Sequence, residues 1–434
     1  MIERLYSWLG NHDAGEREAA YFVAISPTSV LNLAFMLAMW PLLGADEFGL
    51  FAALFGLVAF ATAIGDCLRI VVARRIAELQ QYDDRDASTR ELLSACRPAL
   101  FATISVVGVG LTATPVLKSA LGAPAGPILW TVAACGLSTL IPAMYGALQG
   151  MRQSGLLVQN QMVVTGTRFA LGLALVLTGF GPSGAMAAVV ISFVPSLLLT
   201  ALVLVQDVDE GERLRRPRPL PSNSLAAMVV VALVVAVPGG LDLALARHLL
   251  AAEGAGQYAI VAVFGKGLLL AGIATMYVAI ANGLLDRGGK KDSQDVLWVT
   301  LRQTATYTAG GAFGLLALAA ALNRLAPGSI VASEGALFWY LLAMGALSLT
   351  VTWAYHEISR GLIRPVLGAL GAAALLPVLG VLVFHGSPAG MARVIFLANA
   401  VVLAGSLAPV VHPMLQLSET WDRIRRELQR PSGA

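Results

Sequence analysis

The stretch Pro238–Arg287 decides the organisation of the chain, because a pattern from the first half begins again within it. It opens with Pro238-Gly239-Gly240-Leu241-Asp242, turns at Ala252-Glu253-Gly254-Ala255-Gly256-Gln257-Tyr258-Ala259, and continues as a long apolar run that contains Lys266. The same kind of corner lies between two apolar runs much earlier, at Gly44-Ala45-Asp46-Glu47-Phe48-Gly49-Leu50-Phe51-Ala52. Gly49, Phe51 and Ala52 match Gly256, Tyr258 and Ala259 at a constant spacing. A weak repeat between the halves of an apolar chain predicts two related lobes.

The composition is that of a protein embedded in a bilayer. Of the 434 residues, 57% are hydrophobic and only 13% are charged, and the mean hydropathy is +0.75. A water-soluble domain could not stay in solution with this balance. We therefore expect an all-α, polytopic membrane protein with about twelve transmembrane helices, arranged as two parallel six-helix lobes around a central cavity.

Twelve stretches are long and apolar enough to cross the membrane, which requires about 20 residues. They are 21–43, 48–68, 98–119, 125–148, 157–178, 183–205, 224–246, 256–282, 303–323, 335–355, 366–385 and 391–412. Basic residues test this count, because they gather in cytoplasmic loops. Alternate loops on one side carry roughly 23 of the 29 Lys and Arg residues, and loops on the other side carry 4. This asymmetry predicts a multi-pass protein of the cytoplasmic membrane with both termini in the cytoplasm.

The segment 206–223 separates the first six spans from the last six. It holds four arginines and three prolines, which is typical of a linker rather than a membrane helix. We expect a surface amphipathic segment at 1–20, an N-terminal lobe at 21–205, a cytoplasmic linker at 206–223, a C-terminal lobe at 224–415 and a cytoplasmic tail at 416–434. The corners at Gly44 and Gly254 then lie on the outer side, so the two lobes run in the same direction.

Arg168 is the first candidate for a binding role, since a cation near the middle of a span is costly unless it faces protein or water. Gln161, Thr165 and Gly172 fall on the same face of its helix, so we expect this polar stripe to face the interior of the bundle. Two interpretations stay open. Arg168 is either a structural arginine bonded to helix carbonyls or a contact for an anion in a central cavity, and we favour the second.

Lys266 and Asp242 are the charged candidates of the second half. Lys266 shares a helical face with Tyr277 and with small residues that leave room around an ammonium group. Asp242 follows Pro238, which interrupts a helix and frees backbone groups near which a carboxylate could meet a cation or a proton. Asp242 therefore either forms a structural ion pair with Lys266 or Arg247, or binds a coupling ion, H⁺ or Na⁺.

Three further polar residues are weaker candidates for lining a cavity: Asn32 in the first span, and Gln303 with Tyr307 in the ninth. Enzymatic signals are poor. The pair His356-Glu357 lacks a second histidine at metal-binding spacing, and no phosphate-binding loop is present. We therefore expect no catalytic residues, no metal site, no cofactor and no nucleic-acid partner. Any transport would draw on an ion gradient or on the gradient of the cargo.

Several motifs, taken in order, carry a family resemblance. They are Leu43-Gly44-Ala45-Asp46-Glu47-Phe48-Gly49-Leu50-Phe51, Asp66 with Val72-Ala73-Arg74-Arg75-Ile76-Ala77-Glu78, Ala147-Leu148-Gln149-Gly150-Met151-Arg152, the helix with Arg168, Gly179-Phe180-Gly181-Pro182-Ser183-Gly184, Asp242, Gly254-Ala255-Gly256-Gln257-Tyr258 and the helix with Lys266. With them the first two thirds of the chain resembles the polysaccharide or O-antigen flippases (Wzx-type). This family is a branch of the MOP exporter superfamily, which also includes multidrug extruders and lipid II flippases.

The resemblance implies a flippase that moves a lipid-diphosphate-linked oligosaccharide from the inner to the outer leaflet by alternating access, for cell-surface polysaccharide synthesis. Arg168 and Lys266 would then contact the pyrophosphate, as cations pair with phosphate oxygens. The implied partners are this lipid-linked oligosaccharide and membrane lipids, with other polysaccharide-assembly proteins as candidates.

Three alternatives remain. An ion-coupled drug or small-molecule antiporter of the same superfamily would use Asp242 as its coupling carboxylate and Lys266 as the regulator of that carboxylate. A membrane glycosyl- or acyltransferase is disfavoured, because the outer loops are short and carboxylates are not clustered. A non-transporting assembly partner would have a cavity without functional charges.

Overall fold

The computed structural model describes residues 14–80, 85–151, 153–206, 240–285, 293–325, 334–359, 363–384 and 386–428. Within these ranges all regular structure is helical, which confirms the expected all-α class. The first half contains α2 (Ala14–Gln80), α3 (Arg85–Leu121), α4 (Ala125–Gly150), α5 (Ser154–Leu175), η1 (Val176–Phe180) and α6 (Gly181–Gln206). The second half contains α8 (Asp242–Leu249), α9 (Ala252–Leu285), α10 (Ser293–Leu325), α11 (Glu334–Ser359), α12 (Ile363–Val383) and α13 (Pro388–Leu428).

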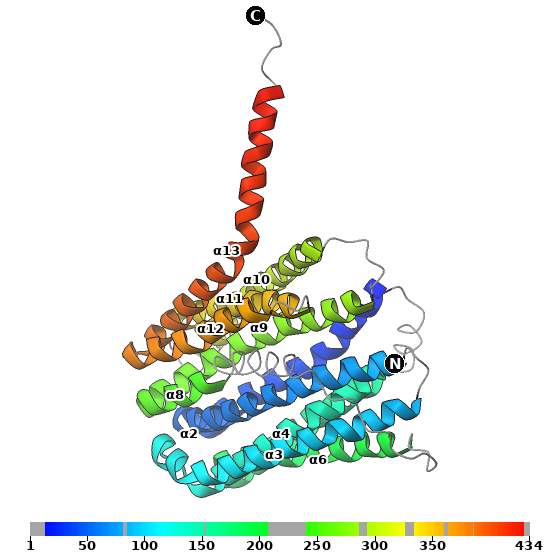
Figure 1. Ribbon diagram of the computed structural model, residues 1–434. Helices are drawn as coiled ribbons and strands as arrows, with labels where there is room; N and C mark the ends of the chain where they lie inside the picture. Colours follow the sequence, from blue (N-terminus) through cyan, green and yellow to red (C-terminus); the bar gives the residue numbers. More distant parts are fainter. Residues whose placement is uncertain are drawn as a thin grey trace, which may run out of the picture.

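The helices form two groups that lie side by side. Figure 1 shows α3, α4 and α6 on one side of the bundle and α10 to α13 on the other. Between them lie α2 of the first half and α9 of the second, and these two helices pack against each other. The two groups correspond to the two lobes that the repeat predicts.

Two glycine-centred breaks explain how the long apolar stretches of the first lobe are divided. α2 covers the first two expected spans and consists of two helices that join at Gly44, where φ is 72°. A φ in this left-handed region is costly for a residue with a Cβ, so glycine is required. The second break separates α5 from α6, at Gly179 with φ 89° and Gly181 with φ 52°.

Most of the expected spans coincide with described helices. The first six spans fall within α2 to α6, and the last five fall within α9 to α13 almost throughout. The seventh span, 224–246, lies mostly outside the described residues, and only its end is present, in α8. Residues 1–13 and 207–223, which include most of the expected surface segment and linker, also lie outside them. α13 continues past 415, and Figure 1 shows its C-terminal part projecting from the bundle.

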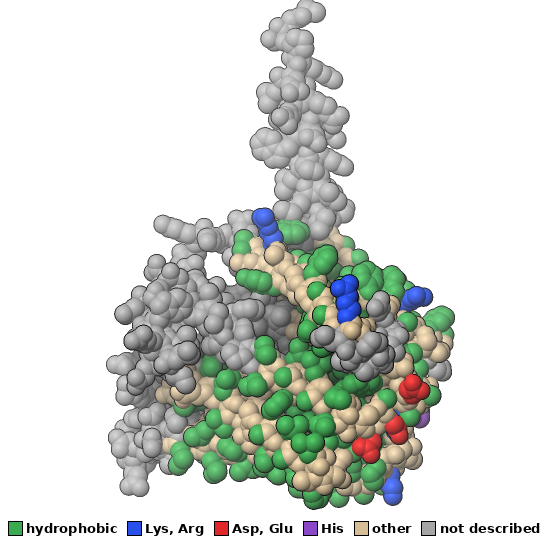
Figure 2. Space-filling model, turned by 180° about the vertical axis from the view of Figure 1, so that it is seen from behind, with side chains coloured by type: hydrophobic (Ala, Val, Ile, Leu, Met, Phe, Trp, Pro, Cys, Tyr) green, Lys and Arg blue, Asp and Glu red, His purple; other side chains and the backbone are tan. Residues whose placement is uncertain are grey.

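The surface of the bundle suits a lipid environment. Eight stretches of described helix are long and apolar enough to cross a membrane. Two of them, Val30–Asp66 with 37 residues and Gly155–Thr200 with 46, contain a glycine break and are each much longer than the roughly 20 residues that one crossing requires. Large apolar side chains are exposed, including Phe101 at 74% and Phe313 at 78%. Figure 2 shows a largely apolar face with acidic side chains gathered along one edge.

The two lobes meet at their repeated corners and at a second glycine pair nearby, Gly56 with Gly240. A Cβ on Gly49 would lie 3.0 Å from the backbone nitrogen of Gly256, and a Cβ on Gly56 would lie 2.5 Å from the carbonyl oxygen of Gly240. These glycines let the backbones of the two lobes approach closely, as small residues do in membrane bundles. From this contact the second helix of α2 and all of α9 run in the same direction, so the lobes are parallel. We call the end of the bundle that holds these corners the outer end, following the orientation predicted by the basic residues.

Candidate functional site

Four polar side chains form a buried cluster in the second lobe, which we call the Asp242 cluster: Asp242, Tyr258, Lys266 and Tyr340. The Lys266 ammonium donates to Oδ1 of Asp242 at 3.0 Å. The hydroxyls of Tyr258 and Tyr340 donate to Oδ2 at 3.0 Å and 2.5 Å. The tyrosine rings meet edge to face with their centroids 5.6 Å apart. Of the two ion pairs considered from the sequence for Asp242, the structure forms the one with Lys266.

Helix packing positions this cluster. Asp242 begins α8, Tyr258 and Lys266 lie two turns apart on α9, and Tyr340 comes from α11. A Cβ on Gly265 would collide with the Tyr340 ring, so glycine at this position lets the ring lie against α9. Asp242 is 5% exposed, and the Lys266 side chain is 17% exposed. A carboxylate so deeply buried is tolerated only with partners, and here it has an opposite charge and two hydroxyl donors.

Arg168 is buried in the first lobe in a different kind of environment. Its Nη1 donates to Oδ1 of Asn32 at 3.2 Å. Its Cζ lies 5.7 Å from the ring centroid of Phe55 and 5.4 Å from that of Phe193, within the range of cation–π attraction. The residue is only 8% exposed, and its Nε has no hydrogen-bond partner. Among the described side chains, no carboxylate forms an ion pair with it. Arg168 therefore has a charge that these neighbours do not neutralise.

The polar stripe expected beside Arg168 does face the interior of the first lobe. Thr165 is 4% exposed and donates to the carbonyl oxygen of Gln161 at 2.8 Å. A Cβ on Gly172 would lie 2.5 Å from the Phe35 ring on α2, so α5 approaches α2 closely on this face. Gln161 itself is half-buried.

Three further candidates, Gln303, Tyr307 and Tyr277, lie on α10 and α9. Gln303 is exposed on α10, and Tyr307 on the same helix is 50% exposed. The side chain of Tyr277 lies outside the described residues. Arg168 and Lys266 belong to different lobes, and the partner of Lys266 is Asp242 rather than any residue that contacts Arg168.

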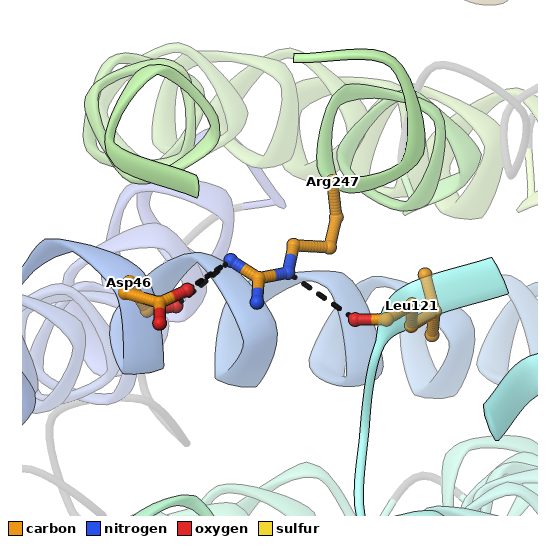
Figure 3. Close-up of polar contacts among 3 residues, drawn as sticks. All are labelled: Asp46, Leu121 and Arg247. Carbon is orange, nitrogen blue, oxygen red and sulfur yellow. Dashed lines mark hydrogen bonds and ion pairs between the residues drawn. The ribbon is translucent and has the colours of Figure 1, made fainter. Parts of the chain in front are cut away.

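Arg247 joins the two lobes at the outer end. Its Nη1 pairs with the carboxylate of Asp46 and donates to the Asp46 carbonyl oxygen at 3.2 Å, while its Nε donates to the carbonyl oxygen of Leu121 at 3.4 Å. Figure 3 shows this side chain reaching from α8 to α2 and to the end of α3. The neighbouring His248 ring lies 3.1 Å from the carbonyl oxygen of Ala120. These contacts hold the second lobe against the first, and we call them the outer latch.

A junction within the first lobe lies late in the second helix of α2, away from the outer end. Arg69 Nε donates to Oε1 of Gln149 at 3.2 Å, and its Nη1 lies 3.8 Å from Asp66. A Cβ on Gly150 would lie 2.7 Å from the carbonyl oxygen of Ala73. The motifs quoted around Asp66 and Gln149 therefore pack against each other, which gives them a structural role in joining α2 to α4.

Sequence reasoning missed several residues of these clusters. Tyr340 lies in an apolar span with no nearby charge, and Phe55 and Phe193 are ordinary core residues until Arg168 is placed between them. Tyr258 carried a usable signal, because it adds a hydroxyl at the repeat position that Phe51 fills in the first lobe. Asp46 carried another, since it is an acidic residue in the first corner.

Comparison with known proteins places the fold. No protein-family pattern and no curated protein matches the chain. Among solved structures, the inward-facing conformation of a multidrug resistance MATE family transporter of the MOP superfamily is similar with a TM-score of 0.66 at 15% identity, covering 94% of this chain and 96% of that one. An outward-facing conformation of a multidrug resistance MATE family transporter is similar with a TM-score of 0.64 at 16% identity, covering 95% and 98%. The structure of MATE in a bent conformation is similar with a TM-score of 0.65 at 16% identity, covering 94% of this chain and 97% of that one.

These likenesses extend over nearly the whole of each chain, so they define the architecture. The protein is an all-α polytopic membrane protein with the two-lobe, twelve-helix fold of the MATE transporters of the MOP superfamily. At 15–16% identity the agreement concerns the fold. The substrate has to be argued from the side chains of this chain.

Proposed function

We propose that this protein is an alternating-access transporter of the cytoplasmic membrane that moves a lipid-diphosphate-linked oligosaccharide from the inner to the outer leaflet for cell-surface polysaccharide synthesis. The fold supports the transport mechanism, because it is shared with structures described as inward-facing and outward-facing. The motifs that resemble Wzx-type flippases support the substrate class. Both termini would lie in the cytoplasm, as the basic residues predict.

The observation that carries the proposal is the unneutralised charge of Arg168. Burial of a cation is costly unless it is paired. Asn32 and the two aromatic rings supply only dipoles and ring quadrupoles, and Nε stays without a partner. An anionic group of a substrate would supply the missing charge. A diphosphate is well suited, because its oxygens match the planar donors of a guanidinium.

The role proposed for Lys266 has to be refined. The sequence suggests a second diphosphate contact, whereas in the structure the Lys266 ammonium is held by Asp242. A contact between Lys266 and the substrate would first require release from this carboxylate. We therefore assign the primary diphosphate contact to Arg168, with Gln161 and Thr165 on the same face of α5. Gln303 and Tyr307 remain candidates for lining the cavity, and Tyr277 remains a candidate for contacting the substrate.

The proposal is tested by surface display of the glycan in the native host. We expect Arg168→Ala to abolish display while the amount of protein in the membrane stays unchanged. Arg168→Lys keeps the charge but loses the planar group, so display should be partly restored. The matched control is Arg393→Ala, because Arg393 also lies over an aromatic ring, with its Cζ 5.8 Å from the centroid of Trp339, but is exposed. Normal display by Arg168→Ala would refute the assignment.

A direct measurement uses purified protein in proteoliposomes with a defined lipid-linked oligosaccharide. A hydrogen bond to a charged group contributes about 1.5–3 kcal/mol, so Arg168→Ala should weaken binding roughly 10- to 100-fold. A lipid-linked sugar with a single phosphate should bind less tightly to the unchanged protein. The Arg168→Ala substitution should also reduce its affinity by a smaller factor.

An ion-coupled drug or small-molecule antiporter is the second candidate, because the similar solved structures include proteins described as multidrug resistance transporters. In that case the substrate would be a cation or a neutral molecule, and Asp242 would be the coupling carboxylate. Export of a cationic dye that depends on Asp242, with no effect of Arg168→Ala on glycan display, would favour the antiporter.

A further inference from the structure

The Asp242 cluster combines a buried carboxylate with two hydroxyl oxygens, and oxygen ligands are the kind that hard cations take; Na⁺ is a hard cation of single charge. In this chain the cation beside the carboxylate is the Lys266 ammonium, which lies 3.0 Å from Oδ1 of Asp242. We propose that Lys266 is a built-in counter-cation that fills this position, so that Na⁺ does not bind here. Replacing Lys266 with a neutral residue should then convert the cluster into a Na⁺ site.

The hydrogen-bond pattern supports this assignment. Oδ1 is taken by the ammonium, and Oδ2 is taken by two hydroxyl groups. The donors therefore occupy both oxygens of the carboxylate, and the ion pair is electrically neutral. A free Na⁺ would have to displace an ammonium that is attached to the same protein and therefore has a high effective concentration at the carboxylate. Without Lys266, the same oxygens would surround an uncompensated negative charge, with the two hydroxyls able to turn their lone pairs toward a cation.

The Asp242 cluster lies next to the contact between the lobes, so its charge matters for transport. This consequence rests on the proposed function. Asp242 lies two residues after Gly240, whose backbone packs against Gly56 of the first lobe. An ion that entered or left the cluster would therefore act next to the contact between the lobes. With Lys266 permanently in place, this point stays neutral through the cycle, and we expect transport that does not use the sodium gradient at this site.

The test measures cation binding rather than transport, so it is independent of the substrate. The full-length protein is purified in detergent at pH 8, and its thermal unfolding is followed by tryptophan fluorescence in NaCl, KCl or choline chloride of equal ionic strength. The unchanged protein should unfold at the same temperature in all three salts. Lys266→Met should unfold at a lower temperature in choline chloride and should be stabilised by NaCl in a saturable manner, as expected for a ligand that binds only the folded state.

Two controls make each outcome decisive. The double variant Asp242→Asn with Lys266→Met lacks the carboxylate and should not respond to Na⁺. Lys266→Gln retains a hydrogen-bond donor without charge and serves if Lys266→Met cannot be purified in any salt. Saturable stabilisation of the unchanged protein by Na⁺ would overturn the proposal, as would indifference of both neutral Lys266 variants to NaCl. Failure of the glycan-display test would leave these outcomes unaffected.

Discussion

Gly49 and Gly256 occupy equivalent positions in the two repeats and touch each other, since a Cβ on Gly49 would lie 3.0 Å from the backbone nitrogen of Gly256. The corners that reveal the repeat in the sequence are therefore also the place where the lobes meet. Contact between equivalent residues indicates that an approximate two-fold axis passes close to this point. We therefore expect a motion that opens the outer end to separate these two backbones.

A first prediction concerns Gly256→Ala. The added Cβ would collide with the carbonyl oxygen of Ala45, and overpacking of this kind typically costs about 1–3 kcal/mol. Because the collision exists only while the lobes touch, the substitution should favour separation of the outer end, roughly tenfold for each 1.4 kcal/mol. Spin labels at the exposed sites Lys118→Cys and Glu253→Cys, in a protein without its natural cysteines, would report longer distances.

The control for this experiment is Gly254→Ala. A Cβ at Gly254 would meet only the Leu250 side chain at 3.7 Å, which is ordinary van der Waals contact, so the distances should not change. Equal distance distributions for Gly256→Ala and the unchanged protein would show that the outer end does not separate at this contact.

A second prediction concerns the outer latch. Arg247→Gln removes the pair with Asp46 and weakens the contacts with two carbonyl oxygens, so the same spin labels should show a larger population with a separated outer end. Exposed ion pairs contribute little, about 0.2–1 kcal/mol. Here the Asp46 side chain is 65% exposed but Arg247 is only 12% exposed, so we expect most of the effect to come from the carbonyl contacts.

Charge exchange separates the two contributions. The double variant Asp46→Arg with Arg247→Asp recreates the side-chain pair but cannot donate to the carbonyl oxygen of Leu121, so it should close the outer end only partly. Complete closure by this double variant would mean that the ion pair alone forms the latch. No change in the single variant Arg247→Gln would mean that the glycine contacts suffice.

Much of the fold could be predicted from the sequence, because hydropathy and the distribution of arginines can be interpreted without knowing how the helices pack. The first six and the last five spans, the order of the lobes and their parallel direction follow from these signals. The glycine break at Gly44 also had a signal, since it begins the repeated corner. The sequence did not reveal that α2 and α9 touch at backbone distance, because this depends on the rotation of each helix about its axis.

The site could be predicted only in its charged members. Arg168, Lys266 and Asp242 are conspicuous because charges are rare within apolar spans. Which of them pair depends on the rotation of each helix and on its depth in the membrane. From the sequence, either Lys266 or Arg247 could be the partner of Asp242. The structure shows that Arg247 pairs with Asp46 in the other lobe. Phe55, Phe193 and Tyr340 contribute through their position alone, and no local pattern distinguishes them from other core residues.

A third prediction is a double-mutant cycle at Asp242 and Lys266. Removal of one partner of a buried ion pair leaves an isolated charge and typically costs about 3–5 kcal/mol, whereas removal of both is much less harmful. Asp242→Asn and Lys266→Met should therefore each lower the free energy of unfolding strongly when measured in choline chloride. The double variant should recover most of this loss. Additive losses would mean that the two groups do not interact in the folded protein.

A fourth prediction concerns topology, which the arginines predict and which labelling of single cysteines can measure. Cys67, Cys96 and Cys135 are first replaced, and a membrane-impermeant thiol reagent is then applied to intact cells. Lys118→Cys and Glu253→Cys should react from outside, because they flank the outer latch and are exposed. Ser222→Cys in the expected linker should react only after the membrane is permeabilised. Reaction of Ser222→Cys in intact cells would reverse the orientation, and the outer latch would then face the cytoplasm.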